Sequence, residues 1–435
     1  MKKFISIISV LVLFVCITPF TASAYKTSGF EVKSEAAILV SLDTGDVIYE
    51  KNADEQRYPA SITKIMTGAL LVENCDDLDT QVTVTKDNVE SLFGSDLTVA
   101  GFLPGENVTL RECLNTLMVC SAADSANVIV DYVEKQTGKN FVDLMNEKAK
   151  KLRMTKTHFV NATGLHDESH YTTARDLVKL CKYAIDLPNF LDICSQATYQ
   201  ISKTNKHDKR TVVTTNFLIN RATNMYYTYA KGIKTGFTTP AGRCVASTAS
   251  KDGYNYLCVV MGGDNVKRTE FSDSKNLYEW AFNNFEYRTV ADTNTIISEM
   301  QVKLSSETDF IQLYPEKNVT VIMPSDISND SIIYDPVITD NNIWAPVEKG
   351  QVLGYVSIKC AGQEIAKVNL VNHDKIERST WLFILEIGKN IVTSGWFIAF
   401  VVILVLIILC LAIAIIVSNK RRRKRLKRVR KIKKL

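Results

Sequence analysis

Residues 57–73 read RYPASITKIMTGALLVE, and this stretch predicts a helix with one apolar face. Apolar side chains recur after Pro59 at the spacing i, i+3, i+4, i+7 and i+8 that one face of a helix requires. Ser61 and Lys64 lie three residues apart on another face, so their side chains are neighbours. A serine beside a desolvated lysine can be a nucleophile with its base. Taken alone, however, S-x-x-K is common and favours a helix-capping serine followed by a surface lysine.

Two β-hairpins are predicted on either side of a mainly helical region. Residues 36–52, AAILVSLDTGDVIYEKN, contain two apolar runs joined by a turn at Asp43-Thr44-Gly45. Residues 243–264, RCVASTASKDGYNYLCVVMGGD, form a second hairpin that turns at Asp252-Gly253. Strands at both ends with helices between them predict a mostly antiparallel sheet covered by helices.

A second group of polar residues lies in residues 229–247, YAKGIKTGFTTPAGRCVAS. Here Lys234 can present positive charge to a carboxylate, and the Thr235 hydroxyl can donate a hydrogen bond. Gly236 lets a substrate backbone approach closely, because it has no side chain. K-T-G alone also fits a turn at the end of a strand.

A break between two predicted helices lies at residues 120–127, CSAADSAN. Upstream, residues 109–112 (TLRE) make a capping box and begin an apolar helical face that ends just before the quoted stretch. Downstream, residues 126–133 begin the next apolar face. The break therefore places Ser121 between the helices, whereas Ser125 falls in the second helix.

The three groups occur in the order S-x-x-K, serine-rich turn, K-T-G, which is the motif set of penicillin-binding proteins and β-lactamases. The chain resembles the exported D-alanyl-D-alanine carboxypeptidases, which are serine-type, low-molecular-mass penicillin-binding proteins. Residues 158–180, HFVNATGLHDESHYTTARDLVKL, resemble the downstream helical segment of that family. The similarity covers about residues 30–375 and also the C-terminal anchor of the family layout.

The resemblance implies an α+β fold: a penicillin-binding/β-lactamase-like antiparallel sheet covered by helices, then a small all-β domain and a C-terminal transmembrane helix. It implies that Ser61 attacks the carbonyl between the last two D-alanines of a peptidoglycan stem pentapeptide and forms an acyl-enzyme. Lys64 would take the serine proton, although the identity of the base is disputed in this superfamily. Ser121 would be the serine of the middle motif. Penicillin and other β-lactams would acylate the same serine.

The resemblance also implies how the substrate is held. Lys234 and Thr235 would bind the terminal carboxylate, and Gly236 would belong to the same strand motif. Backbone N–H groups of Ser61 and Phe237 would hold the oxyanion. No cofactor and no metal are implied.

The chain departs from the family pattern in the middle motif, which is S-x-N. Ala123 replaces its asparagine if Ser121 is the motif serine. Ser125-Ala126-Asn127 has the right letters, but it lies four residues on, about 6 Å along a helix axis. Catalytic geometry tolerates only about 1 Å, so we favour Ser121. We expect the missing amide to slow the enzyme without abolishing activity. Phe237, where histidine is more usual, is a milder departure because a backbone donor tolerates it.

The two ends of the chain predict export and a membrane anchor. Residues 1–24 have a basic start, an apolar core and the small residues Ala22-Ser23-Ala24, as a signal peptide does. Residues 396–417 are uncharged and long enough to cross a bilayer. Residues 418–435 are strongly basic, which predicts a cytoplasmic tail beside anionic lipid. The expected location is the cell membrane, single-pass, with the catalytic domain extracellular. An uncleaved N-terminal anchor is the alternative at the other end.

Three further regions are predicted between these ends. Residues 25–285 form the serine peptidase domain, residues 290–372 an all-β domain and residues 373–395 an amphipathic stalk. Removing the 12 positive charges of residues 420–435 and the two near the start from the net +5 leaves about −9. An acidic exterior domain is a poor candidate for DNA or RNA binding, so no nucleic-acid partner is expected. The scattered cysteines predict mostly free thiols.

Three other functions are weighed against this interpretation. A catalytically weakened or inactive wall scaffold is supported by Ala123. A membrane-anchored β-lactamase shares the motifs, but the β-domain is foreign to that class. A zinc peptidase would use His166 and His170 of HDESH, but Asp167 stands where a catalytic glutamate would be needed.

Overall fold

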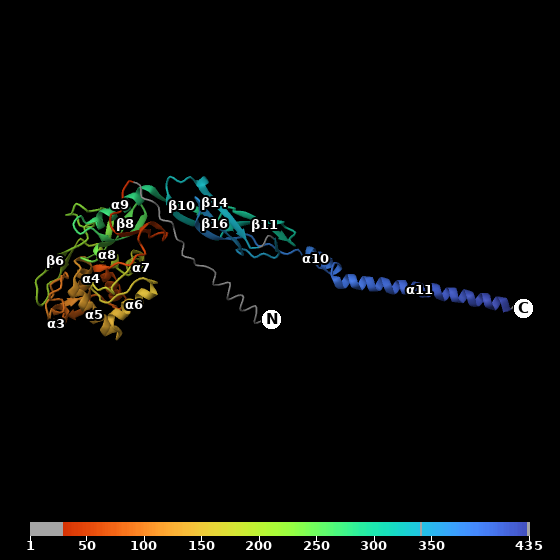
Figure 1. Ribbon diagram of the computed structural model, residues 1–435, viewed down its shortest axis with the longest axis horizontal. Helices are drawn as coiled ribbons and strands as arrows, with labels where there is room; N and C mark the ends of the chain where they lie inside the picture. The colour runs from red at the N-terminus through yellow and green to blue at the C-terminus, as the bar shows by residue number, and fades with distance from the viewer. Residues whose placement is uncertain (1–28, 340–341, 433–435) are drawn as a thin grey trace. The chain divides into compact units, whose positions relative to one another are not determined.

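The computed structural model describes residues 29–339 and 342–432 (Figure 1). The predicted signal peptide, residues 1–24, lies outside the described residues. Contacts divide the chain into two units. The first contains the chain up to Arg288 together with Thr320–Ile327, and the second contains Thr289–Val319 and the chain from Ser328 onward.

The first unit is built on a five-stranded antiparallel sheet in the order β2-β1-β9-β8-β7. Its strands are β1 (Ala36–Ser41), β2 (Val47–Lys51), β7 (Ala230–Thr238), β8 (Gly242–Lys251) and β9 (Tyr254–Gly263). The two predicted hairpins are therefore confirmed, and the first of them joins the sheet beside the second. The order makes β7 an edge strand of this sheet.

The helices of the first unit lie mainly between the two hairpins in sequence (Figure 1). They are η2 (Ala60–Thr63), α2 (Lys64–Glu73), α3 (Lys86–Glu90), α4 (Leu110–Val119), α5 (Ala123–Thr137), α6 (Phe141–Lys151), α7 (Ala174–Ile185), α8 (Phe190–Cys194) and α9 (Thr269–Asn284). Two small antiparallel strand pairs, β3 (Gln81–Thr83) with β4 (Asn107–Thr109) and β5 (Thr198–Ile201) with β6 (Arg210–Val213), lie among them.

Both faces of the sheet are buried, and alternate strand residues enter two different cores. Ile38 and Val40 of β1 pack in the core formed with α2, α4 and α7. Ala37 and Leu39 pack in the second core, on the side of α9. This alternation follows from the two-residue period of a strand. The predicted sheet covered by helices is confirmed.

Helix α2 is buried on all sides, which the sequence pattern did not indicate. Every residue from Lys64 to Leu71 is buried, because α2 lies among α4, α5 and α7. The helix begins one turn later than the predicted pattern, since Ala60–Thr63 form a 3-10 turn before it. The interpretation of Lys64 as a surface lysine is therefore wrong.

The second unit contains a six-stranded sheet in the order β14-β16-β17-β12-β11-β15. Its strands are β11 (Ser298–Lys303), β12 (Phe310–Pro315), β14 (Ile332–Ile338), β15 (Asn342–Trp344), β16 (Val352–Cys360) and β17 (Gln363–Val371). Short β15 pairs with β11 in parallel, while the other pairs are antiparallel. Strands β10 (Phe285–Ala291) and β13 (Val319–Pro324) form a separate pair.

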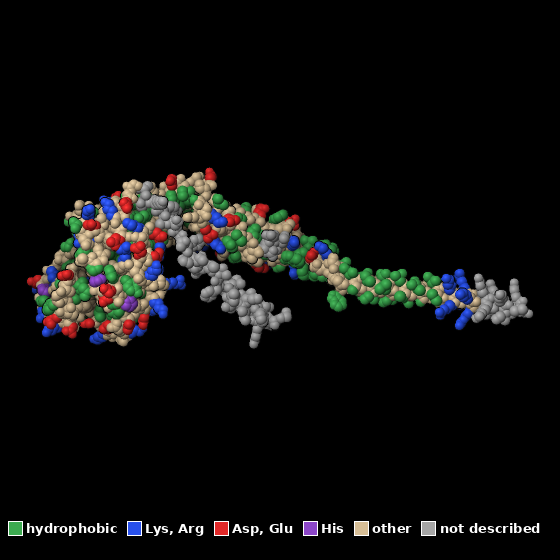
Figure 2. Space-filling view, in the orientation of Figure 1, with side chains coloured by type: hydrophobic (Ala, Val, Ile, Leu, Met, Phe, Trp, Pro, Cys, Tyr) green, Lys and Arg blue, Asp and Glu red, His purple; other side chains and the backbone are tan. Residues whose placement is uncertain are grey.

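Two helices follow the second sheet. Helix α10 (Thr380–Val392) exposes several large apolar side chains, Trp381 and Ile384 among them. Helix α11 (Gly395–Ile432) carries apolar side chains along most of its length and basic ones near its end (Figure 2). Within the described residues it is long and apolar enough to cross a membrane, by length and composition.

Candidate active site

The Ser61 hydroxyl and the Lys64 amine meet where the 3-10 turn runs into α2. Lys64 Nζ lies 3.1 Å from Ser61 Oγ and donates a 2.6 Å hydrogen bond to the carbonyl of Thr163. Lys64 is 0% exposed. Burial, with the nearby charge of Lys234 as a second cause, lowers the pKa of Lys64 well below its ordinary value. A buried amine of low pKa can accept a proton from an adjacent hydroxyl.

Two glycines shape the turn that carries Ser61. Gly164 has φ +79°, and a Cβ placed on it would lie 1.9 Å from the carbonyl oxygen of Ala60. A Cβ on Gly236 would lie 2.9 Å from the carbonyl oxygen of Pro59 and 3.0 Å from the Ser61 nitrogen. Gly236 therefore lets β7 approach the nucleophile turn closely. From the sequence we expected a substrate backbone to approach Gly236 closely. In the structure, the backbone of the nucleophile turn lies close to it.

His170 supports the same turn through a hydrogen bond with Thr63. Its Nδ1 accepts from the Val160 backbone N–H at 3.2 Å, so Nε2 carries the proton and donates to the Thr63 hydroxyl at 2.8 Å. That hydroxyl in turn donates to the Ala60 carbonyl at 2.8 Å. Burial lowers the pKa of His170 to about 4, so the ring is neutral. The sequence considered His170 only as a zinc ligand.

No metal cluster supports the zinc alternative in the part of the chain that the structure describes. Nε2 of His170 is engaged with Thr63, and the ring of His166 packs edge-on against Tyr58 with centroids 4.6 Å apart. The two histidines of HDESH therefore serve separate packing contacts.

Strand β7 brings a second lysine to the site. Lys234 is 1% exposed, and its Nζ donates to the Thr235 carbonyl at 3.0 Å. Burial lowers the pKa of Lys234 to about 8. The hydroxyl of Thr235 shares a hydrogen bond with the hydroxyl of Thr215, whose backbone N–H reaches the Val119 carbonyl at 3.1 Å. Sequence reasoning missed Thr215, because only the fold places it beside β7.

The turn between α4 and α5 lies beside both lysines. Cys120 contributes to the electrostatic environment of Lys64 and of Lys234. The next residue, Ser121, has φ +69° and is 7% exposed. Its hydroxyl forms no hydrogen bond with any other residue that the structure describes. A serine in this left-handed conformation is uncommon and costs about 1 kcal/mol or more.

The alternative residues of the middle motif are used elsewhere. Ser125 is buried in α5, and its hydroxyl bonds that of Thr116 at 2.7 Å. The amide of Asn127 donates to the Asn88 carbonyl and to the Ser91 hydroxyl. Ala123 is fully buried at the first position of α5. Neither serine nor asparagine of the second S-x-N is therefore available to the Ser61 turn.

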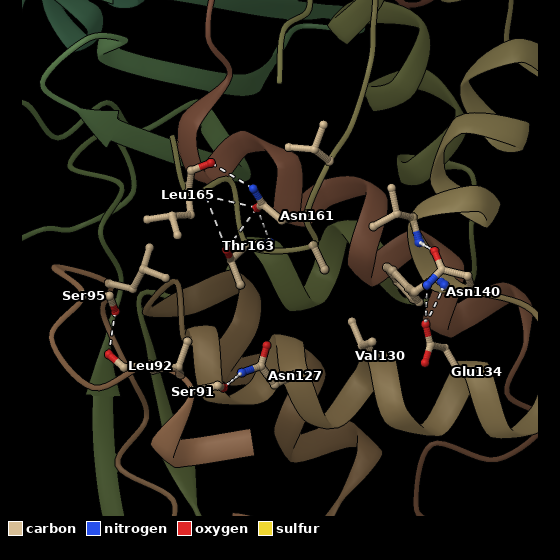
Figure 3. A pocket seen from close by; sticks show the side chains of 15 residues that line it. Ser91, Leu92, Ser95, Asn127, Val130, Glu134, Asn140, Asn161, Thr163 and Leu165 are labelled. Carbon is tan, nitrogen blue, oxygen red and sulfur yellow. Dashed lines mark hydrogen bonds between the residues drawn. The ribbon is translucent and has the colours of Figure 1, made fainter. Parts of the chain in front are cut away.

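A cavity of about 360 Å³ lies between the loop that carries Thr163 and helix α5 (Figure 3). Its polar side chains are already paired. Asn161 accepts from three backbone N–H groups of its own loop, Asn127 donates to Ser91, and Glu134 accepts from the start of α6. Ser61 does not line the cavity. We conclude that this cavity is separate from the reactive side chains.

Comparison with known families gives matches over most of the chain. Residues 20–265 match the family described as D-alanyl-D-alanine carboxypeptidase. Residues 285–378 match the C-terminal domain of penicillin-binding protein 5. The two matched regions together include the five-stranded sheet and the helices η2 to α8 of the first unit and the six-stranded sheet of the second.

Individual relatives agree with these family matches. The D-alanyl-D-alanine carboxypeptidase DacF of Bacillus subtilis is 28% identical, and the alignment covers 87% of this chain and 97% of that protein. DacC of Escherichia coli is 28% identical over 81% of this chain and 88% of its own. Penicillin-binding protein 5 from Haemophilus influenzae has a similar structure, with a TM-score of 0.65, 25% identity and coverage of 81% of this chain and all of the other.

The contact between Gly164 and Ala60 predicts a large cost for one added methyl group. Gly164→Ala forces the backbone carbonyl of Ala60 to move, so we expect a loss of about 3 kcal/mol or more. Gly94→Ala is the matched control, because Gly94 also has φ +79° but nothing lies within 4 Å of the added carbon. It should lose only about 1 kcal/mol, the backbone cost. Thermal unfolding of the detergent-solubilised chain compares the two, and equal losses would contradict the predicted clash.

Proposed function

The chain belongs to the D-alanyl-D-alanine carboxypeptidase family and is a serine-type enzyme of that kind, and we propose that it acts through an acyl-enzyme on Ser61. Its substrate would be the stem pentapeptide of peptidoglycan, from which it removes the terminal D-alanine. The observation that carries this proposal is the buried Lys64 amine 3.1 Å from the Ser61 hydroxyl.

In the proposed acylation, Ser61 Oγ attacks the carbonyl between the two D-alanines while its proton passes to Lys64. The amine is suited to this because burial favours its neutral form. Backbone N–H groups of Ser61 and Phe237 would hold the oxyanion. The close approach of Gly236 to the Ser61 nitrogen supports this pairing of donors from two elements. Collapse of the intermediate breaks the C–N bond, and the leaving amine takes up a proton.

Ser121 is proposed to relay that proton. Its hydroxyl is free of other hydrogen bonds among the described residues and lies in the turn beside both lysines. Water then attacks the acyl-enzyme, with Lys64 again as the base, and releases the tetrapeptide. Penicillin would acylate Ser61 in the same way. It would remain covalently bound, because water would cleave its ester with Ser61 only slowly.

Substrate binding is proposed along β7. As the edge strand of the sheet, β7 can pair with an extended peptide. Lys234 and Thr235 would hold the terminal carboxylate, and the Thr215 hydroxyl is placed to support Thr235. The absent asparagine at Ala123 removes one hydrogen bond to the substrate. For an ordinary hydrogen bond such a loss costs about 1 kcal/mol. For a key transition-state donor it lowers the rate about a hundredfold.

The membrane arrangement is also part of the proposal. Helix α11 would cross the bilayer within residues 396–417, and the basic residues after it would lie in the cytoplasm. Export through residues 1–24 would place residues 25–285 and 290–372 outside the cell, with residues 373–395 as the stalk. The partners would be peptidoglycan stem peptides, β-lactams and the lipid bilayer.

We predict that the full-length protein in detergent releases D-alanine from a stem pentapeptide and forms a covalent adduct with labelled penicillin. Ser61→Ala should abolish both, because the attacking oxygen is removed. Mass spectrometry of the adduct locates the modified residue. A protein that binds peptide but releases no D-alanine would instead support the wall scaffold, and rapid destruction of penicillin would support the β-lactamase.

The two serines of residues 120–127, Ser121 and Ser125, should behave in opposite ways when each is replaced by alanine. Ser121→Ala should lower kcat about a hundredfold or more with little change in stability, because its hydroxyl bonds no described residue. Ser125→Ala should lower the stability by about 1 kcal/mol, because it removes the buried hydrogen bond between the Ser125 and Thr116 hydroxyls, and should keep kcat within about threefold. Measuring D-alanine release and thermal unfolding on both variants separates the roles. A larger loss of kcat in Ser125→Ala would assign the motif to the second serine.

A further inference from the structure

We propose that the Thr98 hydroxyl binds the first amide carbonyl of the substrate upstream of the bond that Ser61 attacks. It would supply the hydrogen bond that Ala123 cannot make. This inference rests on the proposed function, because it assigns a substrate-binding residue to the same reaction. None of the sequence motifs includes Thr98, which lies in the irregular segment between α3 and β4.

A backbone hydrogen bond holds Thr98 beside the position of the missing asparagine. The carbonyl of Thr98 accepts from the Ala123 N–H at 2.8 Å. Ala123 is the first residue of α5 and follows Ser121 by two positions. Two residues joined by such a bond have Cα atoms roughly 5–6 Å apart, so their side chains can serve the same part of a ligand.

Asp124 fixes the segment that follows Thr98. Its carboxylate accepts from the backbone N–H groups of Ala100, Gly101 and Phe102 at 2.9, 3.0 and 3.1 Å. Asp124 is buried, and hydrogen bonds to an ionised carboxylate are stronger than bonds between neutral groups. The segment is therefore attached to α5 at two successive residues. A side chain on it can be held in place before a substrate arrives.

The side chain of Thr98 is available to a ligand. It is exposed, and its hydroxyl bonds no other residue that the structure describes. The preceding residue, Leu97, lines the cavity of Figure 3, whereas Thr98 does not. A threonine hydroxyl can donate one hydrogen bond, as either N–H of an asparagine amide can.

Position 123 itself is closed to the substrate. The side chain of Ala123 has no polar atom and is 0% exposed. Adding atoms at such a buried position strains its neighbours and costs about 1–3 kcal/mol. The donor that the middle motif lacks is therefore more readily supplied from the segment bonded to Ala123 than from position 123.

An extended substrate carries an acceptor that needs such a donor. Along a peptide that pairs with β7, successive carbonyl groups point alternately toward the strand and away from it. In the proposed acylation the attacked carbonyl points toward the Phe237 N–H of β7. The next amide carbonyl upstream then points away from β7 and must find its donor on another element. Thr98 is such a donor, because it is bonded to the start of α5 and not to β7.

The test uses two β-lactams that differ in this acceptor. Benzylpenicillin carries an amide carbonyl beside its β-lactam ring, and 6-aminopenicillanic acid has a free amine in its place. Both present the same ring system to Ser61. The full-length protein in detergent is assayed as wild type, Thr98→Val and Thr98→Ser. Mass spectrometry follows the rate at which the covalent adduct forms, with each compound at concentrations that give a measurable rate.

Thr155→Val is the matched control. Thr155 is also an exposed threonine of the first unit, and its hydroxyl bonds no other residue that the structure describes. It lies in a turn after α6 and not in the segment bonded to α5. The substitution makes the same chemical change as Thr98→Val away from the proposed contact.

We expect Thr98→Val to slow acylation by benzylpenicillin about 5- to 10-fold, as the loss of one neutral hydrogen bond does. Acylation by 6-aminopenicillanic acid should stay within about twofold. Thr98→Ser should keep the wild-type rates, and Thr155→Val should change neither reaction.

Equal slowing of both reactions by Thr98→Val would show that Thr98 only shapes its segment and would overturn the inference. An unchanged rate with benzylpenicillin would overturn it as well. A wild type that neither β-lactam acylates would instead contradict the proposed function.

Discussion

The burial of the Lys64 amine is the constraint on which the rest of the site depends. Among the residues that the structure describes, no carboxylate forms an ion pair with it, and its hydrogen-bond partners are the Ser61 hydroxyl and the Thr163 carbonyl. A charged amine is costly to bury in such surroundings, so the neutral form is favoured. Because Lys64 is buried and its neutral form is favoured, its amine is suited to act as a base. The all-buried helix α2 is what enforces it.

The surrounding elements keep this amine dry and the serine accessible. The loop with Thr163 and Gly164 packs onto the nucleophile turn. His170 holds the same turn through its hydrogen bond with Thr63. Strand β7 approaches closely because Gly236 has no side chain. Three segments far apart in sequence therefore meet within a few ångströms of Ser61.

Much of the fold and part of the site follow from local sequence signals. Turn residues and alternating apolar runs predict the two hairpins, and the helix break predicts where Ser121 lies. Other features depend on contacts between distant residues. The burial of Lys64, the Thr215–Thr235 pair and the position of Thr98 beside Ala123 arise from the packing of helices, strands and loops. The parallel pairing of β15 with β11 likewise leaves no local signal. The K-T-G glycine was identified, but its contact with Ser61 requires the fold.

The pKa of Lys64 itself tests this account most directly. Lysine side chains labelled with ¹³C and ¹⁵N can be titrated by NMR in the detergent-solubilised protein, with Lys64→Arg used to assign the signal. The account predicts that Lys64 titrates well below its ordinary value of 10.5, because burial disfavours its charged form. Because the folded pKa is lowered, the amine gains its charge only as the pH falls through that value, and acylation should slow in the same range. A Lys64 signal that titrates near 10.5 would contradict the proposed role of this amine as the base.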